Sequence, residues 1–159
     1  MSTSYPTFPV PTPGDDPKAT RRRDALQHLL TRLVDAREGL DSMLKRAERE
    51  IEPTLKKLRE EHHEAAERVT ALMVAEGAEP DGSGSAMATV NKTVVSLRAA
   101  FDELDEDALE QVADGEQTVL DAFTGAIEEH DEGRTREELV DMRATLRDLV
   151  DEARRVAAG

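Results

Sequence analysis

The sequence contains no cysteine and no tryptophan, and it has only one tyrosine and three phenylalanines in 159 residues. The missing thiols exclude disulfides, thiolate metal sites and cysteine nucleophiles. No apolar run approaches the roughly 18 residues that a membrane-spanning helix needs, and the first residues lack the basic-then-apolar order of a signal peptide. We therefore expect a cytoplasmic protein whose stability comes from side-chain packing alone.

The apolar and charged fractions are close to each other. Apolar residues make up 38% of the chain and charged residues 35%, which amphipathic helices with one apolar stripe each would satisfy. The length suits one domain that buries a single core.

Acidic residues are concentrated in one segment. Residues 99–133 include thirteen Asp and Glu and no Lys or Arg, so this segment carries most of the net charge of −14. Nucleic-acid binding needs a basic surface that releases counterions, so nucleic acid is not an expected partner. The segment is either a solvated helix face or a docking surface for a basic protein partner or for cations. Association of identical chains into a homo-oligomer is also open.

The first 17 residues form a separate unit, a proline-rich and flexible tail that precedes a helical bundle domain at 18–159. Its five prolines remove backbone donors and restrict φ, so no helix is expected there. The tail also holds Tyr5, Phe8 and Val10. Two interpretations are open: the tail is an extended arm, or these three residues dock onto a groove of the bundle or onto a partner.

Five apolar runs with helical spacing follow the tail. They extend from Leu26 to Ile51, Leu55 to Leu72, Met87 to Leu104, Leu109 to Ile127, and Leu139 to Val156. No segment alternates with the two-residue period of a strand. The predicted fold is therefore all-α, an antiparallel bundle of about five helices.

Local signals place the helix ends. Pro53 separates the first two runs, and Gly77 ends the second. Asp105 is expected to cap the fourth helix, and Thr135 with Glu138 has the spacing of a capping box at the start of the fifth.

Two polar residues occupy core-facing positions in these runs. His62 follows the steps of the second run, and Glu116 those of the fourth. Burial of either group is costly without a partner, so we predict that the two side chains meet in the core. Gly115 would then let a neighbouring helix approach closely. A simple structural pair and a small metal site are both open.

The candidate metal ligands are His62, Glu116 and His130, with iron or another transition metal as the cofactor if one is bound. Asn91 also lies near a stripe edge. Glu60 and His63 have the E-x-x-H spacing of di-iron bundles, but helical geometry points both toward solvent. A full di-iron centre also needs a second such motif, which the chain lacks. No phosphate-binding glycine loop or nucleophile with an adjacent base is visible either.

Four short motifs keep a fixed order along the chain. They are Glu38-Gly39, the stretch Gly77-Ala78-Glu79-Pro80, Gly84-Ser85, and Gly115-Glu116 with Phe123 seven residues after Glu116. In these motifs, the segment from Leu33 to Ile127 resembles the bacterial four-helix-bundle family called domain of unknown function 2383, assigned to the ferritin-like superfamily. The resemblance implies a ferritin-like helical bundle with no established activity.

Departures from that family imply a degenerate or absent metal site. Asn91 stands where relatives carry histidine, Val94 where they carry an aromatic residue, and no histidine occurs near Thr145 or Leu146. The leading interpretation is a non-enzymatic bundle that acts by protein association, with a link to stress physiology as in ferritin-like relatives. The alternative is a metal-binding or oxidase bundle that uses a minimal histidine and glutamate core site.

Overall fold

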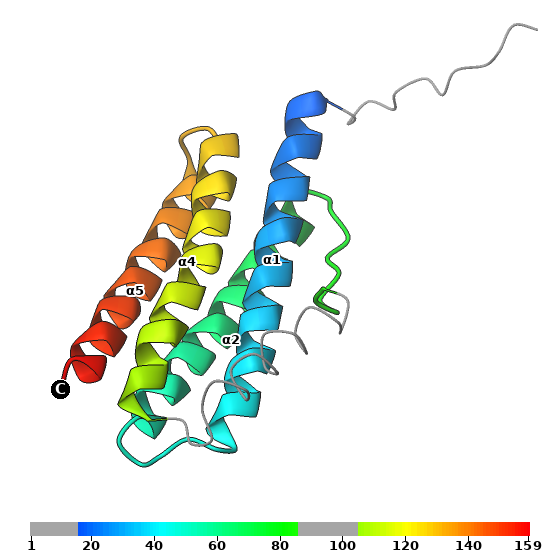
Figure 1. Ribbon diagram of the computed structural model, residues 1–159. Coiled ribbons are helices and arrows are strands. Elements are labelled where there is room, and N and C mark those ends of the chain that lie inside the picture. Colours follow the sequence, from blue (N-terminus) through cyan, green and yellow to red (C-terminus); the bar gives the residue numbers. More distant parts are fainter. Residues whose placement is uncertain (1–15, 86–104) are drawn as a thin grey trace, which may run out of the picture.

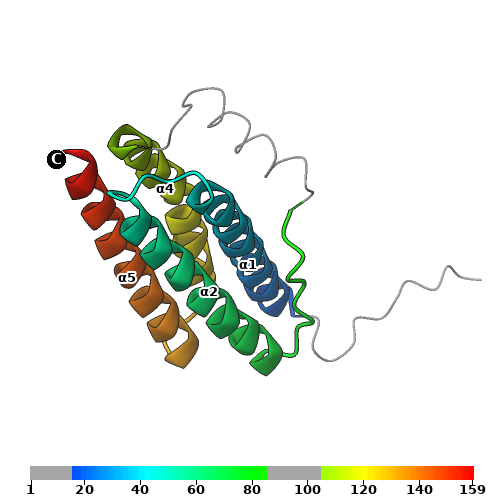
Figure 2. The same ribbon diagram turned by 90° about the horizontal axis from the view of Figure 1, so that it is seen from below.

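The computed structural model describes residues 16–85 and 105–159. These residues form four helices and no strand, and neighbouring helices run antiparallel (Figures 1 and 2). The helices are α1 (Pro17–Leu44), α2 (Glu52–Ala75), α4 (Glu106–Glu129) and α5 (Arg134–Ala157). The predicted all-α antiparallel bundle is confirmed. The run from Met87 to Leu104, with Asn91 and Val94 in it, and the tail residues 1–15 lie outside the described residues.

Helix α1 ends earlier than the sequence predicts, so the connection between α1 and α2 also begins earlier. Helix α1 starts at Pro17, where a missing backbone N–H is harmless, and Asp16 caps it by accepting a hydrogen bond from the Lys18 backbone N–H at 3.1 Å. The helix ends at Leu44, so the prediction that the first helical run continues to Ile51 is wrong. Ile51 is nevertheless buried, because the connection folds it under the bundle just before α2. An apolar spacing alone cannot distinguish these two ways of burying one residue.

The loop after α2 is held against α1. Gly77 ends α2 with a φ of +77°, as predicted. Further on, the backbone N–H of Ser85 donates to Asp35 Oδ1 at 2.9 Å. Gly84 has a φ of +80°, and a Cβ there would lie 2.8 Å from the same carboxylate oxygen, so only glycine fits this approach. Asp35 therefore fixes the end of the loop.

Of the two caps predicted for the starts of α4 and α5, the first is present and the second is absent. Asp105 Oδ1 accepts from the Asp107 backbone N–H at 3.1 Å, which confirms the cap of α4. The capping box at Thr135 is wrong, since the residue that precedes α5 is Gly133, two positions before Thr135, and it provides no side-chain cap. The extended turn at Gly133, with a φ of +152°, sets the start of this helix.

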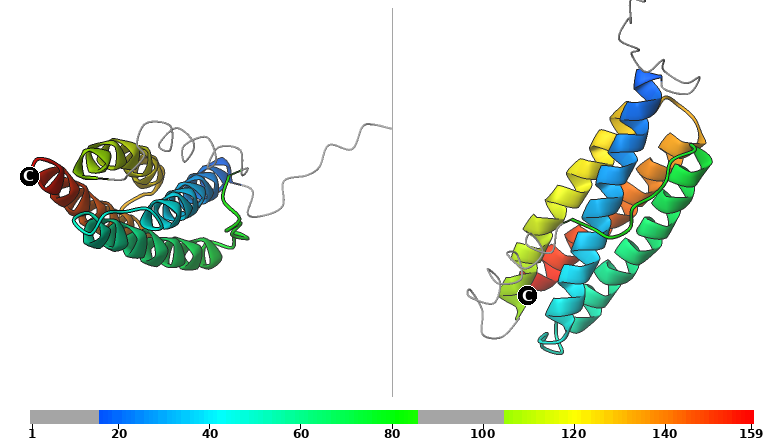
Figure 3. Two further views of the ribbon diagram at one scale, coloured as in Figure 1. Left: turned by 60° about the horizontal axis from the view of Figure 1, so that its bottom comes forward. Right: turned by 90° about the vertical axis from the view of Figure 1, so that its right-hand side faces the viewer.

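The four helices enclose one core. Helix α1 packs on α2 and α4, and α5 packs on the other sides of the same two helices. Helices α2 and α4 therefore lie at opposite corners of the bundle and point in the same direction (Figure 3). The predicted apolar stripes supply the interior, with Leu33, Leu58, Phe123 and Met142 among the fully buried side chains. No helix in the described ranges has both the length and the apolar character needed to span a bilayer.

Candidate functional site

His62 and Glu116 meet in the core, as the sequence predicts. His62 comes from α2 and is 0% exposed, and Glu116 comes from α4 and is 4% exposed. The imidazole Nε2 lies 3.0 Å from Glu116 Oε1, which is hydrogen-bonding distance. The bond therefore joins the two helices that lie at opposite corners of the bundle.

Two atoms of this pair have no hydrogen-bond partner among the described residues. They are His62 Nδ1 and Glu116 Oε2. Glu116 Oε2 lies 2.8 Å from Nε2, but one N–H aligned with Oε1 does not also align with Oε2, so this short distance is an electrostatic contact. Nδ1 is left unsatisfied in either protonation state, because it is an acceptor in the neutral Nε2–H tautomer and a donor in the imidazolium.

The predicted reason for glycine before Glu116 is wrong. No described atom lies within 4 Å of a Cβ built on Gly115, and the residue is exposed. Glu116 therefore reaches the core without help from a close helix approach at its neighbour.

His130 belongs to a second pair, with Glu76. Its Nδ1 lies 2.7 Å from the Ala126 carbonyl oxygen, and its Nε2 lies 2.9 Å from Glu76 Oε1. A carbonyl oxygen only accepts, so Nδ1 must carry a proton. Both ring nitrogens are satisfied here. The His130 side chain is 4% exposed and that of Glu76 is 21% exposed.

The two pairs have related positions. In each pair the two residues are 54 positions apart in the sequence, one in or directly after α2 and the other in or directly after α4. The two helices have 24 residues each, and their first residues are also 54 positions apart. The histidine is on α2 in the first pair, and it directly follows α4 in the second. Fourteen residues separate the pairs along each helix, which corresponds to about 21 Å of helical rise. His130 is therefore too far away to share a ligand with His62 and Glu116.

Sequence reasoning did not identify Glu76 as the partner of His130. The equal 54-residue offset was a signal that could have found it once His62 and Glu116 were paired. It depends, however, on α2 and α4 being parallel and in register, which no local pattern reveals.

The core pair offers two side chains to a metal ion. Protein zinc sites, for comparison, usually use three or four protein ligands. Within the described ranges no group of three or more His, Cys, Asp and Glu side chains gathers closely enough to hold a metal. Glu60 and His63 are exposed, as predicted, and His63 Nδ1 lies 3.3 Å from Arg37 on α1.

The outer face of α4 is acidic. The helix has no Lys or Arg, and its nearest described cation on α5, Arg154, lies 2.6 Å from Glu110 and 3.1 Å from Asp114. The hydrogen bond to Asp114, helped by the charge of Glu110, raises the pKa of Arg154. Several exposed carboxylates on or just after α4 have no ion-pair partner among the described residues: Glu106, Asp107, Asp121, Glu128, Asp131 and Glu132.

Comparisons with known proteins identify a family but not an activity. A family model described as Domain of unknown function (DUF2383) matches residues 22–129. This range includes most of α1, all of α2 and α4, and both residues of the core pair, whereas His130 and α5 follow it. No curated protein and no solved structure matches the chain. Since the matched range is more than half of the sequence, the chain belongs to the DUF2383 family of domains of unknown function.

Proposed function

We propose that this chain is a non-enzymatic, ferritin-like bundle that acts by binding a basic protein partner through the outer face of α4. The observation that carries the proposal is the set of exposed carboxylates on α4 that no described cation neutralises. Like charges on one face repel one another, and a complementary basic surface relieves this repulsion while accelerating encounter. The proposal extends to a role in stress physiology, where such partners are to be sought.

Helix α5 sharpens the location of this surface. Arg154 pairs with both Glu110 and Asp114 at the side of α4 that faces α5, and so offsets one of their two negative charges. Asp121 and Glu128 remain exposed without an ion pair among the described residues. The docking surface is therefore expected to include these two residues and Glu106, and to exclude the side covered by Arg154.

The test is a comparison of three baits in extracts of the source organism. The native chain, a triple variant with Glu106→Lys, Asp121→Lys and Glu128→Lys, and a control variant are each immobilised and their bound proteins identified. Docking through α4 predicts a basic protein that the native chain retains, the triple variant loses, and added salt releases.

The control reverses three exposed carboxylates on other helices, Glu60→Lys, Glu64→Lys and Asp148→Lys, and so makes the same change in net charge. Retention of the partner by this control supports the α4 surface. Loss from both variants assigns binding to net charge alone, and retention by both contradicts the proposal. Sedimentation of the native chain tests the homo-oligomer, which predicts a concentration-dependent mass.

A second candidate is a metal-binding or oxidase bundle that uses His62 and Glu116. The observation that favours it is the presence of two buried ligand-type atoms, His62 Nδ1 and Glu116 Oε2, without hydrogen-bond partners. Histidine nitrogen and carboxylate oxygen suit iron and zinc. His130 lies apart from this pair and would not complete it.

Elemental analysis distinguishes this candidate from the first. Protein purified from iron-supplemented cells is expected to hold a near-stoichiometric metal if the pair is a site, and the double variant His62→Leu, Glu116→Leu is expected to lose it. Metal that persists in the double variant would place any binding elsewhere. Absence of metal from the native protein would count against the candidate.

A further inference from the structure

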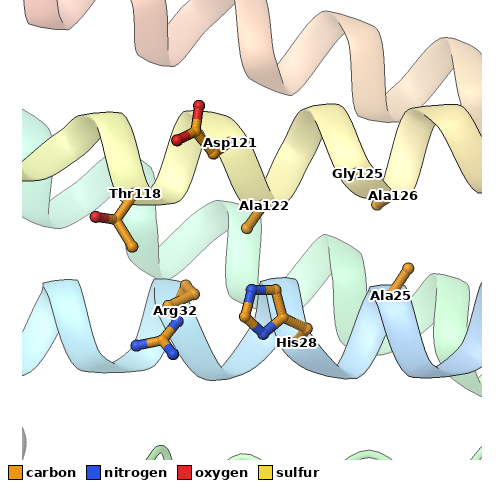
Figure 4. Close-up of a pocket in the computed structure, with 8 residues that line it drawn as sticks. All are labelled: Ala25, His28, Arg32, Thr118, Asp121, Ala122, Gly125 and Ala126. Carbon is orange, nitrogen blue, oxygen red and sulfur yellow. The ribbon is translucent and has the colours of Figure 1, made fainter.

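A surface groove runs between α1 and α4 in the half of the bundle near the start of α1. Its volume is about 480 Å³. Small residues, Ala25 from α1 with Ala122 and Ala126 from α4, keep it open, and no described atom lies within 4 Å of a Cβ built on Gly125. Figure 4 shows these residues with the polar side chains that line the same groove.

The polar lining of the groove is rich in hydrogen-bond donors. Arg32 and His28 come from α1, and the Thr118 hydroxyl comes from α4. The Arg32 Nε atom is buried and has no hydrogen-bond partner among the described residues, whereas Arg32 Nη1 lies 3.8 Å from Asp35 Oδ2. Asp121 also lines the groove, but its carboxylate points away from α1 (Figure 4). A ligand that accepts hydrogen bonds without donating many would therefore fit.

We propose that this groove binds the proline-rich segment 5–13 of the same chain. Four of its nine residues are prolines, which keep their carbonyl acceptors but have no backbone N–H. In a polyproline II conformation the chain turns once every three residues, so Tyr5, Phe8 and Pro11 share one face. Their rings fill the space left by the alanines, and the carbonyl groups meet Arg32 and Thr118.

The lengths of the two segments agree. Arg32 lies fifteen residues after the start of α1, or about 22 Å along the helix. If Gly14 and the two residues after it reverse the chain, Tyr5 lies about 25 Å back from Pro13 in a polyproline II segment. Phe8 then lies near Ala25 and His28, and Tyr5 lies near Arg32.

The only other segment that leads past this groove, residues 86–104, is too short to line its whole length as a helix. Residues 86–104 connect Ser85, which is bonded to Asp35, with Asp105 at the start of α4. A helix that lined the groove up to Ala25 and Ala126 would rise about 15 Å from the level of Asp35 and descend about 31 Å to Asp105, which takes about 31 residues. The intervening segment has 19.

Paramagnetic relaxation in the full chain tests the proposal. The native sequence has no cysteine, so a nitroxide can be attached at one site, Gly115→Cys, which is exposed and one turn before Thr118 on α4. Docking predicts a graded loss of amide signal in the tail, largest at Tyr5, smaller at Phe8 and smallest at Val10. A label at Ala144→Cys, exposed on α5, is the control and should leave these signals unchanged.

A sequence variant and a mixed sample decide the remaining outcomes. With the Gly115→Cys label, the variant Tyr5→Ser, Phe8→Ser is expected to recover the Thr7 amide signal, because the ring contacts that hold the tail are lost. Equal effects from both labels, or no effect from either, would overturn the proposal. So would attenuation of residues 86–104 without attenuation of the tail, or attenuation that appears when isotope-labelled native chains are mixed with spin-labelled unlabelled chains, since a second copy would then supply the tail.

Discussion

The two histidine and glutamate pairs differ in how completely their polar atoms are satisfied. In the middle of the bundle, His62 and Glu116 are almost fully buried and leave one ring nitrogen and one carboxylate oxygen without partners. At the end of the bundle, His130 uses both nitrogens, and Glu76 keeps part of its surface in water. Both pairs connect the same two corners of the bundle with the same residue offset.

This difference indicates different roles. The end pair has the complete bonding expected of a structural contact, which holds the last turns of α2 and α4 together. The core pair has unsatisfied buried atoms, which are costly in a position where leucine would pack without loss. The core pair is therefore the better candidate for a function, and substitutions at both pairs can test whether the difference is energetic as well as geometric.

The largest effect is expected from breaking the core pair on one side. Glu116→Ala should lower the free energy of unfolding by roughly 1 to 3 kcal/mol, because it leaves a buried imidazole without its partner. Urea denaturation followed by circular dichroism measures the change. If the role of the pair is only structural, His62→Leu with Glu116→Leu should recover most of the loss. A double variant no more stable than Glu116→Ala would contradict a purely polar origin of the loss.

A smaller effect is expected at the end pair. Glu76→Ala should cost about 0.5 to 1.5 kcal/mol, since Glu76 is partly exposed and water can replace it at the His130 ring. The same denaturation series measures this. If Glu76→Ala lowers the free energy of unfolding by more than Glu116→Ala does, then burial does not determine which pair contributes more to stability.

Glu61, the neighbour of His62, contrasts with the glutamates of the two pairs, because none of the described cations is bonded to its carboxylate. Its contribution to stability is expected to depend on pH. Burial, followed by the charge of Glu64, raises its pKa. Because the pKa of Glu61 is higher in the folded than in the unfolded protein, Glu61 favours the folded state most at pH values below the unfolded-state pKa. This stability is lost as the pH rises through the folded-state pKa. Glu61→Gln is therefore expected to stabilise the protein at pH 7 by about 0.5 kcal/mol or less, as the side chain is only half-buried. Denaturation near pH 3.5 should show no gain, and an equal gain at both pH values would rule out ionisation as its cause.

The smallest effect is the coupling between the pairs. The sites are about 21 Å apart along the helices, so the losses from Glu116→Ala and Glu76→Ala should add within about 0.5 kcal/mol. A double-mutant cycle measures the difference. Coupling well above this value would mean that α2 and α4 respond as one unit, and that the two pairs are not independent.

The sequence by itself determined the helical class, the core faces and the inward position of His62 and Glu116. These features depend on spacing within one helix, where a repeat of three to four residues defines the buried face. Local chemistry also predicted the Asp105 cap and the end of α2 at Gly77. It failed at Thr135, because a glycine turn with an unusual φ began α5 two residues earlier than a Thr135 cap would have done.

The tertiary structure alone decided which helices lie opposite each other, and therefore which polar residues meet. The separation of His130 from the core pair, its bonds to Glu76 and Ala126, and the groove between α1 and α4 all depend on the relative register of separate helices. Apolar stripes specify that helices pack, but many registers bury similar apolar area. The directional hydrogen bonds and side-chain volumes that distinguish these registers form only when distant segments come together.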